Sequence, residues 1–251
     1  MVRHPYLQRE SPLAIAHRGG ALETLENTLE AFDYAASLGY RYIETDVQVT
    51  RDGVVVACHD ELIDRISNES GSVGSWDWER LSKLSILGGS SLVDIESLLQ
   101  RLPDTNFNID VKTDAVVEPL LGVLTRLDAF DRVCIGSFSD DRIRRVRAAQ
   151  PGSVCTSLGR RGSIRSLLSS FGLPIEPPPG DALQLPVRYR GYDILTEKFI
   201  SHAHDLGFAV HAWTIDERAE MERLLDLGID GLMTDRPSLL KQVFAERGLE
   251  L

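Results

Sequence analysis

The chain has 251 residues, of which 43% are hydrophobic and 26% charged, so it can bury a sizeable core without disulfides or metals to hold it together. Its formal charge of −11 argues against duplex nucleic acid as a partner, because such binding depends on clustered Lys and Arg that neutralise phosphates. The longest apolar runs are strand-sized and too short to span a membrane. The first ten residues lack the apolar stretch of a signal peptide, which predicts a cytoplasmic protein without stable membrane anchoring.

In chain order, strand-like apolar runs alternate with helix-like segments, which is typical of a parallel sheet built from βα units. Strands are predicted at residues 13–16, 41–47, 106–111, 132–136, 153–156, 182–185, 208–213 and 231–234. A short run at 54–58 is predicted to be an extension rather than a further strand of the main sheet. The capping-box spacing of Asn27 and Glu30 predicts a helix that starts there and ends at Gly39. Further helices are predicted at 116–127, 140–149, 196–206, 216–227 and 237–247.

Two stretches interrupt this alternation. Residues 60–103 are irregular and predict an insertion after the second strand, with small helices near 78–84 and 92–101. The Pro-rich residues 174–179 exclude regular structure. Eight strands, each followed by a helical segment, predict a single domain over residues 1–251 that folds as an α/β TIM (β/α)8 barrel. In the alternative, a doubly wound open sheet, the acidic residues and histidines of the chain would not meet at one end of a barrel.

Acidic side chains lie within otherwise apolar strands. Glu44 and Asp46 are two residues apart and therefore face the same side of a strand. Two buried charges together require either a cation between them or a retained proton. The next strand repeats this spacing with Asp110 and Lys112. Oxygen ligands in a chain that lacks cysteine pairs favour Mg²⁺ or Ca²⁺, so Glu44, Asp46 and Asp110 are predicted to bind a divalent cation.

Single histidines, His17 and His59, close two further apolar runs. Like the acidic residues, His17 falls at the carboxyl end of a predicted strand, where TIM barrels carry their active sites. With Lys112 and Arg18 as positive charges for an anionic group, the two imidazoles fit general acid/base catalysis on a phosphodiester. Which histidine takes the proton stays open. Simpler roles are a turn contact with Asp60 for His59 and a salt bridge with Asp110 for Lys112.

Other candidates have structural interpretations. Trp213 ends a strand, where an aromatic residue belongs to a core at least as often as to a pocket. His202, His204 and His211 are interpreted as structural. The cysteines are odd in number, widely spaced and set in apolar surroundings, which predicts reduced core residues; they are Cys58, Cys134 and Cys155.

Several motifs in this order and spacing resemble the glycerophosphodiester phosphodiesterase family. They are Ala-His-Arg-Gly (16–19), Leu-Glu-Asn-Thr-Leu-Glu-Ala-Phe (25–32), Ile-Glu-Thr-Asp-Val (43–47), His59 with Asp60, Asn-Ile-Asp-Val-Lys (108–112), Ser137 with Phe138, His-Ala-Trp-Thr (211–214) and Gly-Leu-Met-Thr-Asp (231–235). The resemblance implies a TIM barrel with an insertion after the second strand. It also implies cation-dependent hydrolysis of glycerophosphodiesters to an alcohol and glycerol 3-phosphate.

Carried over by matching position, the resemblance makes His17 and His59 the acid/base pair and Glu44, Asp46 and Asp110 the metal ligands. It makes Arg18 and Lys112 phosphate contacts, Glu26 a polar support at the mouth, and Phe138 and Trp213 pocket walls. Two features depart from the family. Asp110 stands where glutamate is more usual, and the proline common before Glu26 is absent.

Two alternative functions stay open. A lysophospholipase D-like activity would need an apolar groove near the mouth. Apolar residues of the insertion could form this groove, although such residues more often form a small core of their own. They are Trp76, Trp78, Leu81, Leu84, Ile86 and Leu87. A non-catalytic barrel binding module is the second alternative. The partner in the leading hypothesis is a small phosphodiester; its head group, the choice between Mg²⁺ and Ca²⁺, and the oligomeric state are left open.

Overall fold

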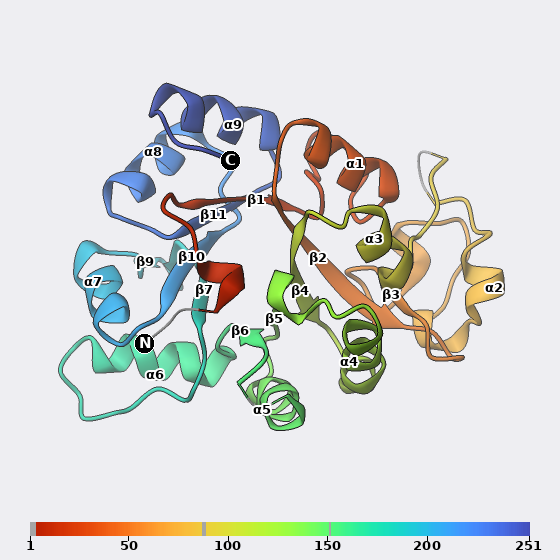
Figure 1. Cartoon of the computed structure of the whole chain (residues 1–251), viewed down its shortest axis with the longest axis horizontal. Coiled ribbons are helices and arrows are strands. Elements are labelled where there is room, and N and C mark those ends of the chain that lie inside the picture. Colours follow the sequence, from red (N-terminus) through yellow and green to blue (C-terminus); the bar gives the residue numbers. More distant parts are fainter. Residues whose placement is uncertain (1–3, 87–88, 151) are drawn as a thin grey trace.

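A computed structural model of the chain describes residues 4–86, 89–150 and 152–251, in which eight parallel strands form a barrel surrounded by helices (Figure 1). The strands are β1 (Leu13–His17), β2 (Tyr42–Val49), β4 (Asn106–Val111), β5 (Val133–Gly136), β6 (Cys155–Thr156), β7 (Ala182–Pro186), β10 (Ala209–Trp213) and β11 (Gly231–Thr234). They pair in chain order, and β11 returns to pair with β1. A single parallel bridge between Ser157 and Ala182 joins β6 to β7. The predicted TIM barrel is confirmed, and this strand order excludes an open sheet.

Each barrel strand leads to one helix on the outside. These helices are α1 (Leu29–Ser37), α3 (Ile95–Arg101), α4 (Val117–Arg126), α5 (Asp140–Ala149), α6 (Arg160–Ser169), α7 (Glu197–Asp205), α8 (Arg218–Asp226) and α9 (Pro237–Glu246). All but α6 were predicted, with ends that shift by a few residues. The small strand β3 (Val55–Ala57) pairs antiparallel with β2 outside the barrel, as predicted for the extension.

The start of α1 differs from the prediction. Its N-cap is Thr28, whose Oγ1 accepts the backbone N–H of Ala31 at 3.2 Å. Asn27 precedes the helix with a positive φ of 56° and a buried side chain. The predicted capping box with Asn27 as its first residue is therefore wrong, because the hydroxyl of Thr28 caps the helix and the Asn27 side chain does not.

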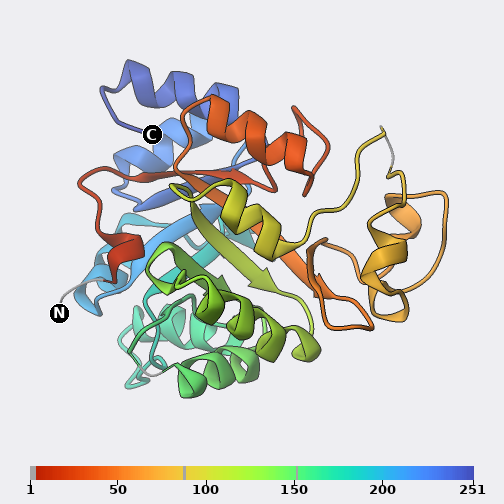
Figure 2. The same cartoon turned by 45° about the vertical axis from the view of Figure 1, so that its right-hand side comes forward.

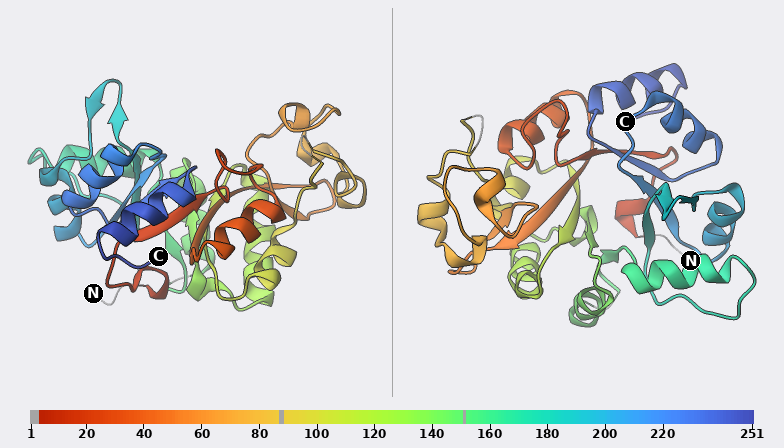
Figure 3. Two further views of the ribbon diagram at one scale, coloured as in Figure 1. Left: turned by 90° about the horizontal axis from the view of Figure 1, so that it is seen from above. Right: turned by 180° about the vertical axis from the view of Figure 1, so that it is seen from behind.

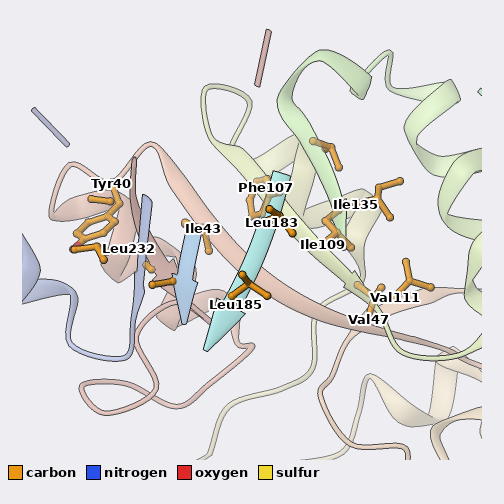
Figure 4. Close-up of a cluster of buried hydrophobic side chains, with 14 of the residues drawn as sticks. Tyr40, Ile43, Val47, Phe107, Ile109, Val111, Ile135, Leu183, Leu185 and Leu232 are labelled. Atoms are coloured by element: carbon orange, nitrogen blue, oxygen red, sulfur yellow. The ribbon is translucent and has the colours of Figure 1, made fainter. Parts of the chain in front are cut away.

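Alternate residues along each strand face opposite sides of the barrel wall. The outward-facing side chains pack against the helices, and Figure 4 shows them rising from neighbouring strands. The inward-facing ones fill the amino-terminal half of the barrel; they are Leu13, Ile15, Tyr42, Cys134, Cys155, Ala182, Ala209 and Met233. Tyr6 and Leu7 of the short helix η1 (Pro5–Leu7) join this cluster, and Figure 1 shows η1 lying over the centre of the barrel. The carboxyl half is thereby left for polar groups.

All three cysteines are free and buried, as predicted. Burial raises the pKa of the Cys58 thiol to about 12, so this thiol stays protonated and unreactive.

The insertion packs around its own small core and extends to one side of the barrel (Figure 2). It contains η2 (Ile63–Arg65), η3 (Val73–Ser75) and α2 (Trp78–Leu81). Trp76, Leu81 and Ile86 are buried within this core, and Trp78 and Leu84 pack against it, so they are not placed to form a groove at the mouth. Leu87 lies outside the described residues. Helix α3 packs into the main core instead, which ends the separately packed part at Leu92.

One hairpin was not predicted. Strands β8 (Arg188–Tyr189) and β9 (Tyr192–Asp193) pair antiparallel and project from the same side of the barrel as the insertion, at the opposite edge (Figure 3, left). Among the described residues, no helix is long and apolar enough to cross a membrane.

Candidate active site

A cavity of about 410 Å³ lies at the carboxyl ends of the barrel strands. The predicted site residues that line it are His17, Arg18, Glu44, Asp46, His59, Asp110, Lys112, Phe138 and Trp213. Glu26 lies directly behind this lining, in contact with Arg18 at 3.3 Å. The structure therefore brings together residues that are separated by almost 200 positions in the sequence.

Strand register produces this arrangement. Parallel pairing sets His17 of β1 beside Glu44 of β2, and Asp46 of β2 beside Asp110 of β4. Because alternate residues face the same side, all four side chains turn into the barrel at neighbouring levels. The apolar residues between them, such as Ile43 and Ile109, face the helices and anchor the strands in the core.

Glu44 is a strongly perturbed carboxylate. Its side chain is buried at 4% exposure, and burial together with the neighbouring Asp46 charge raises the pKa of Glu44 to about 8. It accepts the backbone N–H of Arg18 at 3.1 Å, and Nε2 of His17 lies 3.7 Å away. These contacts do not neutralise it fully, so this position favours either a proton or an added positive charge.

Asp46 is surrounded by donors. Its carboxylate lies 2.6 Å from Nζ of Lys112, 2.8 Å from Nε of Arg18 and 3.3 Å from Nδ2 of Asn27. Burial alone would raise the pKa of Asp46, but Lys112 and Arg18 outweigh it and hold that pKa below its usual value. Asp46 is therefore the permanently charged member of the acidic pair.

Lys112 bridges two carboxylates, since its Nζ is 2.6 Å from both Asp46 and Asp110. Its contact with Asp110 was the simpler role considered for it, and the second contact shows that it also belongs to the acidic cluster. In the described part of the chain, no three His, Cys, Asp or Glu side chains are gathered closely enough to hold a metal ion as they stand. The ammonium of Lys112 takes the place between Asp46 and Asp110.

His17 is oriented by a residue that the sequence argument had given no role. Nδ1 of His17 donates to Oδ1 of Asp235 at 2.7 Å, which leaves Nε2 as the nitrogen on the side of Glu44. Burial lowers the pKa of His17, but the Glu44 charge and the Asp235 hydrogen bond raise it further, and the net shift is upward. Asp235 directly follows β11, the strand that closes the barrel against β1.

His59, which also lines the cavity, has the same design. Its Nδ1 donates to Oδ1 of Asp60 at 2.6 Å, so this turn contact and a place in the cavity coexist. Asp60 in turn accepts Nε of Arg65 at 2.5 Å, and Nη2 of Arg65 donates to Glu26 at 2.6 Å. Burial would raise the pKa of Asp60, but the Arg65 and His59 contacts lower it. Arg65 thus ties the insertion to both His59 and Arg18.

The far wall of the cavity is apolar. Phe138 and Trp213 meet edge to face with their ring centroids 5.9 Å apart. Beyond them, α6, β7, the β8–β9 hairpin and the residues next to α6 and the hairpin supply Leu158, Ile164, Leu167, Leu185, Pro186, Tyr189 and Ile194. An apolar surface at the mouth therefore exists, but it comes from the opposite side to the insertion.

The remaining histidines lie away from the cavity lining. His202 contacts Ser169 at 2.8 Å and His204 contacts Asp230 at 2.6 Å, while His211 is buried inside the barrel near Gln184. These contacts agree with their interpretation as structural residues.

The fold and the site together define a TIM-barrel enzyme with acidic, basic and imidazole groups at the catalytic end of the barrel. The model of the glycerophosphoryl diester phosphodiesterase family matches residues 17–239. The chain belongs to this family, and it is an enzyme of the glycerophosphodiester phosphodiesterase type. This excludes the hypothesis of a non-catalytic binding module.

The chain is similar to named relatives over almost its whole length. It is 39% identical over 250 residues to the "Probable glycerophosphodiester phosphodiesterase 2" of Mycobacterium tuberculosis, covering 97% of this chain and 94% of the relative. It is 28% identical to "Lysophospholipase D GDPD3" of Homo sapiens, covering 93% and 85%.

Solved structures share the fold. A putative glycerophosphoryl diester phosphodiesterase from Silicibacter pomeroyi superimposes with a TM-score of 0.81 at 20% identity, over 98% of this chain and 99% of the other. An Oleispira antarctica phosphodiesterase in complex with the product sn-glycerol-3-phosphate gives a TM-score of 0.77 at 18% identity, over 94% and 97%.

Proposed function

We propose that this enzyme hydrolyses glycerophosphodiesters to glycerol 3-phosphate and an alcohol, with His17 and His59 as its general acid and base and a divalent cation as its cofactor. The observation that carries the proposal is a pair of imidazoles, each held at Nδ1 by an aspartate, that line one cavity together with Arg18 and Lys112. The resemblance of the fold to a phosphodiesterase in complex with sn-glycerol-3-phosphate agrees with this product.

The phosphate of the substrate would bind to the positively charged side chains of Arg18 and Lys112. Arg18 and Lys112 both reach Asp46, so each is held in place by a buried carboxylate before substrate arrives. A guanidinium and an ammonium held in this way pay little ordering entropy when they bind the two non-bridging oxygens of a diester. Glu26, which accepts from Arg18 and Arg65, fixes the guanidinium from behind.

Hydrolysis requires two proton transfers. One imidazole takes a proton from the attacking water through Nε2, and the other gives a proton to the oxygen of the departing alcohol as the phosphorus–oxygen bond breaks. Asp235 and Asp60 each accept from Nδ1, so each carboxylate stabilises the imidazolium that forms on its partner. Which histidine acts as base is left to experiment.

The acidic side chains supply the oxygen ligands that a hard divalent cation requires, although in the described part of the chain they are not gathered around one position. Burial beside Asp46 raises the pKa of Glu44 to about 8, which means that this buried carboxylate lacks sufficient positive charge. Glu44, Asp46 and Asp110 would hold the ion, which would polarise a phosphoryl oxygen. Lys112 now neutralises Asp46 and Asp110, so binding of the ion competes with these two ion pairs.

The test is release of glycerol 3-phosphate from glycerophosphocholine and glycerophosphoethanolamine by the purified protein. We expect EDTA to abolish release and either Mg²⁺ or Ca²⁺ to restore it. Full release in EDTA contradicts the cofactor assignment alone. No release from either substrate with any divalent ion contradicts the substrate assignment.

A second candidate function is supported by the apolar wall of the cavity. Leu158, Leu167 and Leu185 lie on the side of the cavity that faces away from the charged groups, and Ile164 stands at its exposed rim. An acyl chain on the glycerol would find apolar contacts there, which favours hydrolysis of lysophospholipids by the same site. Turnover of lysophosphatidylcholine with none of glycerophosphocholine would make this the main activity.

A further inference from the structure

Helix α6 exposes an unusual face. Its exposed residues follow helical spacing and form one stripe of arginines and aliphatic side chains: Arg160, Arg161, Ile164, Arg165 and Leu168. Phe171 continues the stripe just after the helix and is 68% exposed. Surface helices of a soluble domain normally turn such aliphatic residues inward, so this face is equipped for contact with something outside the chain.

The β8–β9 hairpin extends the same surface. Nη2 of Arg160 donates to the hydroxyl of Tyr189 at 3.1 Å, which joins the hairpin to α6. Tyr192, close to the hairpin turn, is 77% exposed. Figure 3 (left) shows the hairpin standing out beyond the barrel. We call the exposed side chains of α6, Phe171 and the hairpin the α6–hairpin surface.

The charge of this surface is opposite to that of the chain. Residues 159–193 hold five arginines and three acidic residues, whereas the whole chain has 27 Lys and Arg against 38 Asp and Glu. Of these acidic residues, Asp181 is paired with Arg147 outside the surface, and Asp193 is paired with Arg188 within the hairpin. Among the described residues, most other arginines are paired with carboxylates. In contrast, Arg165 donates to the Glu176 carbonyl and Arg190 lies over the Tyr189 ring.

We propose that the α6–hairpin surface docks the enzyme reversibly on anionic phospholipid membranes. Arginines attract an anionic leaflet, and tyrosine and phenylalanine are suited to the headgroup region, where their rings lie between water and acyl chains. A protruding hairpin and one helix face can enter that layer without rearrangement of the barrel. The excess of arginine over acidic side chains on this surface complements the negative charge of such a leaflet.

Docking would also place the cavity at the membrane. Arg160 and Tyr189 belong both to this surface and to the cavity rim, so the cavity mouth would face the lipid. Substrates made by deacylation of phospholipids arise at that surface. The inference concerns binding alone, so it can fail while the proposed hydrolysis holds, and the reverse.

The experiment measures co-sedimentation of the full chain with vesicles of equal parts phosphatidylglycerol and phosphatidylcholine, and with vesicles of phosphatidylcholine only. We expect binding to the anionic vesicles that weakens with added salt, and little binding to the neutral ones. The double variant Arg161→Glu with Arg165→Glu should weaken binding by at least about tenfold, and so should Phe171→Ser with Tyr192→Ser. None of these four residues lines the cavity, so turnover of glycerophosphoethanolamine should remain unchanged and show that the variants are folded.

Arg144→Glu with Arg145→Glu on α5 is the matched control, because it reverses two exposed arginines of a neighbouring helix that pair with Asp141 and Glu118. It should bind vesicles almost as the unmodified chain does. Absence of binding to anionic vesicles, equal binding to neutral ones, or an equal loss in the control overturns the proposal. So does a concentration-dependent dimer in sedimentation velocity that the α6–hairpin variants dissolve, because the surface would then be covered by a second copy.

Discussion

The two walls of the cavity differ in how their side chains are held. On the wall formed by β1, β2, β4 and the insertion, nearly every polar group is fixed by another one, as Arg18 is by Glu26 and Asp46. On the wall formed by α6, β7 and the hairpin, aliphatic side chains meet the cavity with few polar contacts. We call the first the charged wall and the second the apolar wall. On the charged wall, a change in any one group disturbs the groups that it contacts, so we expect substitutions there to affect the reaction itself. On the apolar wall, a side chain can be exchanged at small cost, so we expect substitutions there to affect which substrates bind.

The largest effect is expected on the charged wall. His17→Ala and His59→Ala should each lower kcat/KM for glycerophosphodiesters by about 10²–10⁴-fold, because each variant would lack one of the two proposed proton-transfer groups. Steady-state assay of glycerol 3-phosphate release measures this. His202→Ala is the control, since His202 contacts Ser169 away from the cavity and should keep nearly full activity. Full activity in either cavity variant contradicts its assignment.

Removal of the buried Glu44 charge should lower activity but raise stability at high pH. The pKa of Glu44 is raised from 4.5 to about 8 in the folded protein, so the folded state binds more protons than the unfolded one between these values. Stability of the metal-free protein is therefore favoured at low pH and lost as the pH rises through about 8. Glu44→Gln removes this loss and should also abolish most activity.

Thermal unfolding in EDTA measures the effect. The variant and the unmodified chain should have similar Tm near about pH 5, and the variant should exceed it by several degrees near about pH 9. Added Mg²⁺ or Ca²⁺ should raise the Tm of the unmodified chain alone. A Glu44→Gln variant that is less stable than the unmodified chain at high pH would contradict the prediction that the ionised Glu44 carboxylate destabilises the metal-free fold.

Much of the charged wall could be predicted from the sequence because strand periodicity carries it. Because Glu44 and Asp46 are two residues apart in a strand, they face the same side of the barrel wall, and this does not depend on the conformation of the loops. Asp235 had a signal that could have been used: it follows the last strand, and closure of a barrel must bring that strand beside the first, which ends in His17. Asn27 had none, because its role depends on a positive φ that only the folded loop reveals.

Beyond Phe138 and Trp213, the part of the apolar wall that α6 and the hairpin form could not be predicted, for a physical reason. Helix detection relies on apolar residues that face inward, whereas α6 buries Gly162 and Ser166 and exposes Ile164 and Leu168. Its pattern is therefore reversed. The sequence offers the insertion as a source of an apolar groove, with a small local core as the more frequent alternative, and Trp76 and Leu81 form that core. Composition alone does not distinguish a small core from a binding surface.

A smaller effect is expected where the insertion joins the charged wall. Arg65 donates to Asp60 and Glu26, which hold His59 and Arg18 respectively, so Arg65→Ala should loosen both groups and lower kcat by about tenfold with little change in KM. Arg51→Ala is the matched control, because Arg51 also ties the insertion to the barrel, through Asp77, but away from the cavity. Equal losses in the two variants would mean that Arg65 acts only by holding the insertion in place.

The smallest effect is expected on the apolar wall. Ile164 lines the cavity and is 43% exposed, so Ile164→Asn can be accommodated without a change in the core. If an acyl chain lies there, the variant should turn over lysophosphatidylcholine about fivefold more slowly and glycerophosphocholine at an unchanged rate, because only the longer substrate reaches α6. The ratio of the two kcat/KM values measures this. An equal loss for both substrates would place the glycerol or head group against α6, and the division of the cavity into a reacting wall and a selecting wall would then be wrong.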